Sequence, residues 1–548
     1  MRNQLRLMVA GAVVFLPCQL YSQAEHDHHD GKPPEQLGRV VFPTTCNDKA
    51  QVRFERGLVL LHSFWYEEAG NTFAAVIAAD SNCAMGYWGQ AMSTLHPLWT
   101  PPSPKENATA LATAEQAVHL ARPGSREADY ARAIATYYRG YDSTEHRTRL
   151  LAYQAAMEKV AQRHPQDDEA RILYALALIA VGQLEVGDTT YARQRRAAGI
   201  LEPLFRKNPE HPGLAHYLIH AYDYPGLAER GTIAAARYAR IAPSVPHALH
   251  MPSHIYTLIG QWDQSIQSNL RSAQAARRFE QEQHLEGLWD QHGHALDYLA
   301  YAYLQEGRDA EAKRIVDQMK QVTSGFPPNS LINDYALAAI PARYALERGQ
   351  WSEAKALTVR PAPSWRATEA ITHFARAVGA ARSDDSAAAR VEIDSLSVIG
   401  SALAKAGGPQ VYWSKQVEIQ RVAASAWLAR EVGDTAEALR LAASAADLED
   451  VTAKHPVTPG AVLPARELYG DLLLETGRAS DALRAYQASL ARQPNRARSL
   501  LGMARAALSA GDRAAALRSY RRFLRLMEKA DRARPELSEA RKALALSP

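Results

Sequence analysis

Residues 477–486 read GRASDALRAY, and residues 511–520 read GDRAAALRSY. Aligned without gaps, the two stretches share a glycine, an alanine, a leucine, an arginine and a tyrosine, each displaced by 34 residues. A fixed displacement of this size is typical of repeat proteins, in which each unit packs against its neighbours. Apolar residues at helical spacing flank both stretches. The sequence therefore predicts one helix that ends at each glycine and a second helix that follows it.

Looser copies of this glycine turn occur upstream, with longer helices or loops between them. They begin at Gly260, Gly307, Gly349 and Gly433, and a further unit at the front contains Gly57, Ala69 and Phe73. Residues 51–545 thus resemble the tetratricopeptide-repeat family, whose period is 34 residues. The resemblance implies an all-α solenoid of antiparallel helix pairs. In that family the glycine closes the first helix, the alanine permits close packing and the aromatic residue fills the gap between helices.

Four strings narrow the resemblance further, and all of them lie before residue 306. They are LHSFWYEEA (61–69), AMGYWGQAM (84–92), HALHMPSHIY (247–256) and HALDYLAYAYLQ (294–305). They resemble a His-rich subfamily of exported bacterial repeat proteins that has no settled activity. This likeness therefore adds no catalytic residues.

The chain divides by composition into four segments. We expect a signal peptide at 1–24, a polar His-rich segment at 25–50, His- and Tyr-rich repeats with a groove site at 51–330, and regular repeats with a capping helix at 331–548. Arg2 and Arg6 precede an apolar run at 7–16, and small residues suited to cleavage end the segment at Ala24. This favours a periplasmic or secreted protein. A lipoprotein signal at Cys18 is disfavoured because Pro17 precedes it.

Two cysteines follow the signal peptide, Cys46 and Cys83. An even pair in an oxidising compartment predicts a disulfide. Each cysteine comes just before an expected helix of adjacent repeats, so the bond would lock the first repeat.

Histidines gather on the first helices of several repeats, which line the inner groove of such a solenoid. His216 and His220 form one pair at i and i+4, and His250 and His254 form a second pair 34 residues later. Residues four apart share a helix face. Pro252 must kink the second helix or mark its first turn, so His254 is the safer member of its pair.

His294 extends the set, and a carboxylate repeats beside it. Asp223 follows His220 by three residues, and Asp297 follows His294 by the same offset. Either carboxylate is a candidate ligand or a support for a ligating imidazole. Histidines with a carboxylate suit non-heme iron, whereas histidines alone suit zinc, copper or nickel.

The remaining histidines have a plainer interpretation. We expect His62 and His96 to pack beside Trp65 and Trp99, and His247 to contribute less than its neighbours. Solvent or turn positions are expected for His119, His146, His164, His211, His284, His373 and His455. For any one inner histidine, hydrogen bonds that tie repeats together are the favoured explanation, whereas for His216, His220, His254 and His294 as a set metal binding is weighed equally. In the N-terminal segment, His26, His28 and His29 are expected to lie in a solvated tail, with loose metal capture as the alternative.

Several function classes are disfavoured. The chain has no H-E-x-x-H, no G-x-S-x-G, no phosphate-binding loop and no dinucleotide fingerprint. With 63 basic and 59 acidic residues and no basic stripe, a nucleic-acid partner is not expected. No apolar stretch reaches the roughly 20 residues of a membrane span.

Three hypotheses remain. The first is an exported scaffold that binds a peptide or an envelope protein in its concave groove, and the prevalence of adaptors among such solenoids places it first. The second is an iron-, copper- or zinc-dependent enzyme acting on a small molecule or on oxygen, and the third is a metal-binding protein without turnover.

Overall fold

A computed structural model describes residues 35–99, 101–185, 187–359 and 363–545. The expected signal peptide and the three histidines of the N-terminal tail lie outside these residues. Within them, none of the helices combines the length and the apolar character that a bilayer crossing requires. The disulfide between Cys46 and Cys83 is formed, as predicted.

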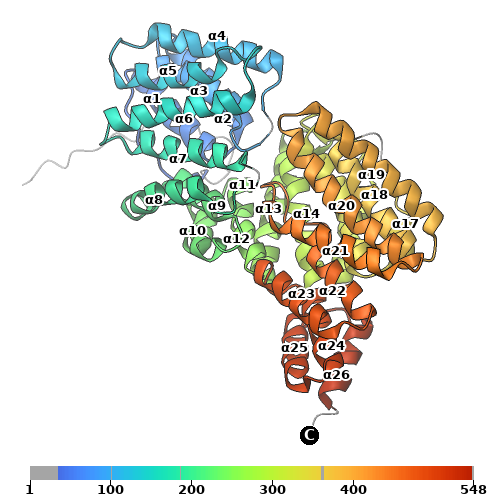
Figure 1. The fold of residues 1–548 in the computed structure, drawn as a ribbon. Helices are drawn as coiled ribbons and strands as arrows, with labels where there is room; N and C mark the ends of the chain where they lie inside the picture. Colours follow the sequence, from blue (N-terminus) through green and yellow to red (C-terminus); the bar gives the residue numbers. More distant parts are fainter. Residues whose placement is uncertain (1–34, 100, 186, 360–362, 546–548) are drawn as a thin grey trace, which may run out of the picture. The chain divides into compact units, whose positions relative to one another are not determined.

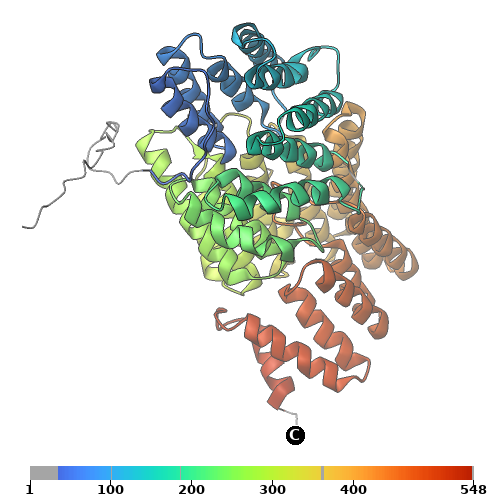
Figure 2. The same ribbon diagram turned by 90° about the vertical axis from the view of Figure 1, so that its left-hand side faces the viewer.

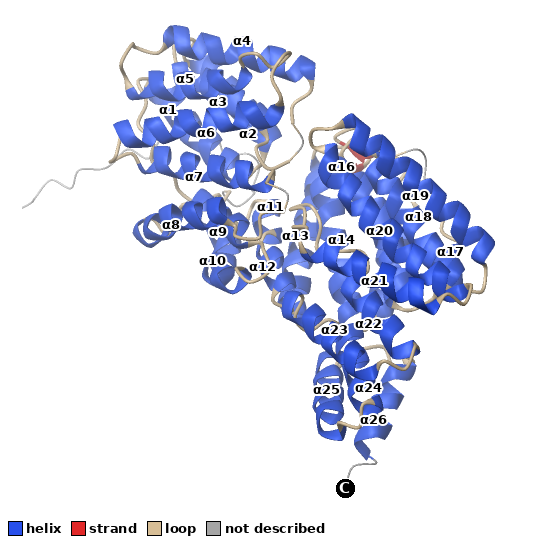
Figure 3. Ribbon diagram, in the orientation of Figure 1, coloured by secondary structure: helices blue, strands red, loops and turns tan. Residues whose placement is uncertain are grey.

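The described chain is almost entirely helical, as the repeat pattern predicts (Figures 1 and 3). The first third contains α1 (Asp48–His62), α2 (Tyr66–Ala79), α3 (Ala84–Leu95), α4 (Pro104–Leu120), α5 (Arg126–Tyr138), α6 (His146–Arg163), α7 (Asp168–Gln183) and α8 (Ala192–Lys207). The middle contains α9 (Pro212–Tyr222), the 3-10 helix η1 (Ala228–Gly231), α10 (Thr232–Ile241), α11 (Pro246–His250), α12 (Pro252–Leu258), α13 (Trp262–Glu282), α14 (Asp290–Gln305), α15 (Asp309–Lys320), α16 (Leu331–Glu347) and α17 (Trp351–Lys355). The last third contains α18 (Arg366–Ala381), α19 (Ser386–Ala406), α20 (Gln410–Glu431), α21 (Thr435–Asp450), α22 (Ala465–Glu475), α23 (Ala479–Arg492), α24 (Ala497–Ser509), α25 (Arg513–Leu526) and α26 (Pro535–Ala545).

Strand structure is confined to two short segments in the described residues. β1 (Leu288–Trp289) pairs in parallel with β2 (Gly325–Phe326). The side-chain amide of Asn333 donates to the carbonyls of Leu288 and Phe326, which ties both strands to α16. The expected all-α fold is confirmed.

The C-terminal helices α22–α26, drawn in red in Figures 1 and 2, follow one another as antiparallel neighbours. Gly477 and Gly511 have φ angles of +76° and +84°, a left-handed conformation that favours glycine at the end of a helix. Tyr486 of α23 fills the space that Gly470 and Gly502 leave free, since a Cβ at Gly502 would lie 2.3 Å from its ring. The sequence assigned these roles correctly.

The same packing unit occurs at the front of the chain. Phe73 of α2 lies where α1 and α3 have glycines, and a Cβ at Gly89 would approach its ring to 2.3 Å. Cys83, the residue before α3, bonds to Cys46 just before α1. The disulfide therefore links the starts of two successive first helices.

The histidine-bearing helices α9, α11, α12 and α14 form one group of neighbours, in which α12 contacts the other three and α11 also contacts α14 (Figure 1). The segment 451–464, which connects α21 and α22, returns to this region from far along the chain. Thr458 accepts a hydrogen bond from Tyr298 of α14 at 3.1 Å, and Lys454 forms an ion pair with Asp223 at 2.8 Å. Residues more than 150 positions apart thus enclose the histidines.

Candidate metal centre

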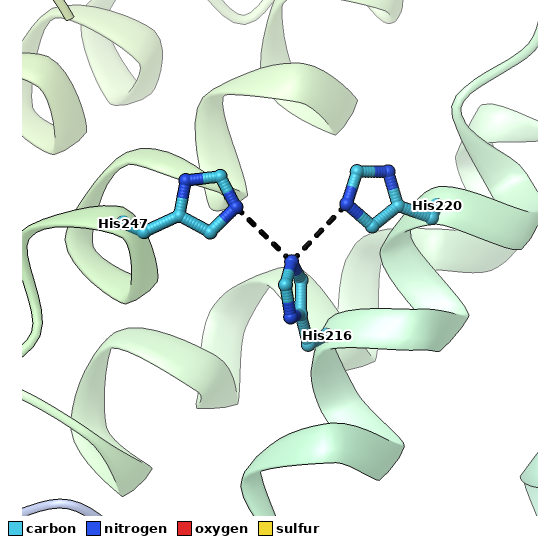
Figure 4. Close-up of side chains that lie close together, drawn as sticks. All are labelled: His216, His220 and His247. Atoms are coloured by element: carbon cyan, nitrogen blue, oxygen red, sulfur yellow. Dashed lines mark hydrogen bonds between the residues drawn. The ribbon is translucent and has the colours of Figure 1, made fainter. Parts of the chain in front are cut away.

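The first triad consists of three histidines whose ring nitrogens lie close together: His216, His220 and His247 (Figure 4). His216 and His220 are one turn apart on α9, and His247 comes from α11. The Nε2 atom of His216 lies 3.1 Å from the Nε2 atoms of both partners. The three rings therefore point their outer nitrogens at one place.

His250, His254 and His294 form the second triad in the same way. Pro252 occupies the first turn of α12, one of the two alternatives that the sequence left open, and His250 ends the short helix α11 before it. The two rings still face each other, with their Nε2 atoms 2.9 Å apart. The ring of His294, from α14, is tilted by 48° against that of His250, with centroids 4.2 Å apart.

The two triads are adjacent. The ring centroids of His220 and His254 are 6.0 Å apart, and those of His247 and His250 are 6.1 Å apart. All six rings are buried, with exposed fractions between 0% and 5%.

Hydrogen bonds to the inner ring nitrogen Nδ1 fix the tautomer of two rings in the first triad. His216 Nδ1 lies 2.7 Å from the backbone carbonyl of His62, and His247 Nδ1 lies 3.0 Å from Gln291 Oε1. Because a carbonyl oxygen only accepts, each Nδ1 carries the proton. In the neutral rings, each Nε2 then presents a lone pair to the triad.

The second triad has the same arrangement. His250 Nδ1 donates to Asn269 Oδ1 at 2.6 Å, and the Asn269 amide is oriented by its own donation to the Ser265 carbonyl. His254 Nδ1 donates to Asp223 Oδ2 at 2.8 Å. Acceptors of this kind hold ligating imidazoles in metal sites and raise their basicity.

Lone pairs at these distances repel unless a cation lies between them. A proton there would convert one ring to imidazolium, but burial and the neighbouring histidines hold the pKa of all six rings below the ordinary value, to about 3 for His250. Two nitrogens bound to one metal ion at about 2.0–2.1 Å lie roughly 2.9–3.4 Å apart at ordinary coordination angles. The observed nitrogen separations of 2.9 and 3.1 Å match that range.

In each triad, one aromatic ring lies close to all three histidines. Phe64, in the turn after α1, has its ring centroid 4.3, 5.6 and 6.0 Å from those of the first triad. Tyr298, one turn beyond His294 on α14, lies 4.8, 4.9 and 5.2 Å from those of the second. These contacts restrict ring rotation and exclude water.

A third group, His62, Glu169 and His211, also lies within ligand distance. Here each nitrogen has an ordinary hydrogen-bond partner. His62 donates to Glu169 at 2.9 Å and accepts from Tyr217, while His211 donates to Glu169 at 2.6 Å and accepts from the Leu214 backbone. Neutral rings satisfy every hydrogen bond of this network without a metal ion. We therefore interpret it as a structural link between α1, α7 and α9.

The two aspartates that share an offset from histidine have different environments. Asp223 holds His254, on another helix, and pairs with Lys454. Asp297 instead faces Arg343 of α16 at 3.5 Å. Burial raises the pKa of each aspartate to about 6, against the opposing charge of its basic partner. The shared offset from a histidine therefore does not give the two aspartates the same contacts: Asp223 reaches His254, whereas Asp297 reaches Arg343.

The structure brings all five sequence-predicted ligands, His216, His220, His250, His254 and His294, into the two triads. His247, expected to contribute less, completes the first. The H-x-x-H spacing of His247 and His250 was the available signal.

Several other expectations need correction. His62 contacts Tyr217, Glu169 and His211 instead of packing beside Trp65. His96 stacks 4.3 Å from Tyr66. His211, expected in solvent or a turn, is the buried N-cap of α9. Lys454, Asn269 and Gln291 were missed because their contacts come from tertiary packing.

No protein-family profile matches the chain, and a search of curated proteins gives no match. Among solved structures, Naa15/Naa10 bound to HypK-THB is 12% identical, with 90% of this chain and 72% of that chain covered and a TM-score of 0.22. The human IFIT1 dimer with m7Gppp-AAAA is 14% identical, with coverages of 89% and 92% and a TM-score of 0.35. A monomeric IFIT1 mutant with Gppp-AAAA is 14% identical, with coverages of 92% and 96% and a TM-score of 0.35.

Proposed function

We propose that the two triads bind a pair of transition-metal ions and that this pair is the centre of a metal-dependent enzyme acting on a small molecule. The observation that carries the proposal is the convergence of ring nitrogens within each triad, with acceptors on Nδ1 behind four of the six rings. A site that presents lone pairs to a dry interior is built for a cation.

Copper is the metal that the ligand set favours. The converging atoms of both triads are imidazole nitrogens, and the nearest carboxylate, Asp223, is occupied as the acceptor of His254. This disfavours iron, which prefers a carboxylate beside its histidines. Among divalent ions, nitrogen ligands bind copper most tightly.

Catalysis is supported by the number and placement of ligands. Three protein ligands leave a coordination position open, as in catalytic metal sites, whereas structural sites are closed by four. Two such ions in adjacent triads can hold one small molecule, such as dioxygen, between them.

A peptide-binding scaffold is the alternative that a repeat fold alone favours. Such a scaffold needs side chains that a polypeptide can reach. With exposed fractions of 0–5%, the six histidines suit an ion better than a peptide. Export and a protein partner remain predictions from the sequence.

Elemental analysis of protein purified without a histidine tag tests the metal. After incubation with equal copper, zinc and iron, we expect two equivalents of copper, one in His216→Ala, one in His250→Ala and none in the double variant. His119→Ala, which removes an exposed imidazole outside the site, is the matched control and should retain two. Less than about one-tenth of an equivalent of any transition metal in the wild type would overturn the proposal. A preference for zinc would overturn the assignment of copper.

Oxygen uptake tests the catalytic part. With ascorbate supplied in excess as the reductant, the copper-loaded protein should consume more dioxygen in an oxygen electrode than its own metal pair could reduce, and neither single-triad variant should. Full copper loading without uptake would leave a metal-binding protein and reject the enzyme.

A further inference from the structure

A cavity of about 890 Å³ lies beside the candidate metal centre. This volume falls within the usual range for small-molecule sites. Its wall combines residues of the first third of the chain, such as Tyr191, with residues of α20 and of the segment 451–464. The function proposed above does not yet use this space.

The wall of the cavity touches the surroundings of both triads. Trp99 lies edge-on to His247, with ring centroids 5.6 Å apart. Lys454 forms an ion pair with Asp223, the acceptor that holds His254. Both Trp99 and Lys454 line the cavity. Trp99 therefore lies between the cavity and the first triad, and Lys454 and Asp223 lie between the cavity and the second.

Six of the residues that line the cavity are tryptophan or tyrosine. They are Trp99, Tyr191, Tyr224, Trp365, Tyr412 and Trp413. Several are held in place by neighbours: Trp365 donates its indole N–H to the carbonyl of Asn329 at 2.8 Å, and the rings of Tyr191 and Tyr224 lie 4.7 Å apart. Fixed aromatic faces bind planar aromatic ligands by stacking and edge contacts.

The charged residues of the wall do not favour a ligand of either charge. The lining includes the acidic residues Glu145, Glu185 and Asp188 and the basic residues Arg147, Lys415 and Lys454. Glu185 lies 3.9 Å from Arg147 and 2.8 Å from Arg193, and Lys454 is paired with Asp223. A preferred net charge of the ligand is therefore not built into the site.

We infer that this cavity binds a planar aromatic small molecule beside the proposed metal pair. Only the neighbouring metal pair rests on the proposed function. Binding itself is a property of the cavity and is testable without metal.

The experiment uses metal-free full-length protein and 2-naphthol, whose fluorescence reports binding, with saturated decahydro-2-naphthol as the competitor of matched skeleton. We expect 2-naphthol to bind about tenfold more tightly than the saturated alcohol, because only the planar ring stacks. Trp365→Ala should weaken 2-naphthol binding about fivefold to tenfold. Trp351→Ala, which removes a half-buried tryptophan outside the cavity, should leave it unchanged.

Equal binding of the two alcohols, or no binding of 2-naphthol, would overturn the inference. These wild-type measurements decide the matter even when a variant fails to fold. The metal content of the same preparations is measured separately, so absence of metal and absence of naphthol binding identify failures of the two different proposals.

Discussion

Replacing Asp223 with asparagine distinguishes the metal affinities of the two triads without removing any of the six histidines. Asp223 Oδ2 accepts from His254 Nδ1 at 2.8 Å and from Lys454 Nζ at 2.8 Å. Asparagine keeps the size of the side chain and an acceptor for His254. It removes the negative charge and leaves the Lys454 ammonium group without its carboxylate, close to the second triad.

The expected loss follows from the position of this carboxylate behind a ligand. Changes of such supporting groups weaken metal binding about 10- to 100-fold, which corresponds to roughly 1.4–2.7 kcal/mol. The loss should fall on one of the two ions, since the hydrogen bond and the ion pair of Asp223 reach His254 and Lys454 but no ring of the first triad. Titration of copper against a competing chelator measures the two binding constants.

Asp297→Asn is the matched control, because Asp297 has the same offset from a preceding histidine but faces Arg343. We expect both copper constants of this variant to stay within about twofold of the wild type. Thermal unfolding of both variants checks that the fold is retained. The reasoning fails if the two asparagine variants weaken copper equally, or if Asp223→Asn changes neither constant.

Three further predictions concern the fold. Arg496 is fully buried between Glu347 and Glu467, 2.8 and 2.9 Å from their carboxylates. Because Arg496→Met leaves both carboxylates without this partner, it should destabilise the protein by about 3–5 kcal/mol in urea unfolding. A loss of stability below about 1 kcal/mol would contradict this prediction. Burial alone would raise the pKa of Glu467, but Arg496, Arg498 and Ser499 lower it below 4.5. The unfolded chain therefore binds more protons in acid, so this stabilisation is complete above about pH 4.5 and declines below it. The difference in unfolding free energy between wild type and Arg496→Met should accordingly shrink from pH 6 to pH 4, and a difference that grows would reverse the sign we assign. Gly502→Ala places a Cβ 2.3 Å from Tyr486 and should destabilise the protein by about 1–3 kcal/mol. Gly199→Ala, in the exposed part of α8, meets no atom within 4 Å and should stabilise the protein by up to about 1 kcal/mol. Equal melting shifts in the two variants would refute the packing argument.

The supporting contacts of the site show where prediction from sequence ends. The acceptors of His247 and His250 are Gln291 and Asn269, which are 44 and 19 residues away. Neither residue lies at a position of the repeat pattern that would identify it from the sequence as a partner of histidine. Their roles depend on how α13 and α14 rotate against α11, and that rotation is set by packing of whole faces rather than by a local signal.

The sequence alone determined the helix pairs, the glycine turns, the disulfide and the helix faces that carry most of the histidines. These features are local or repeat at a fixed period, so propensity and spacing specify them. Only the tertiary structure decided that six histidines divide into two triads, that Asp223 serves His254 while Asp297 serves Arg343, and that Lys454 reaches Asp223 from 231 residues away. The physical reason is that a repeat period fixes contacts between neighbouring units, whereas the return of the segment 451–464 to α14 depends on the accumulated rotation of many units.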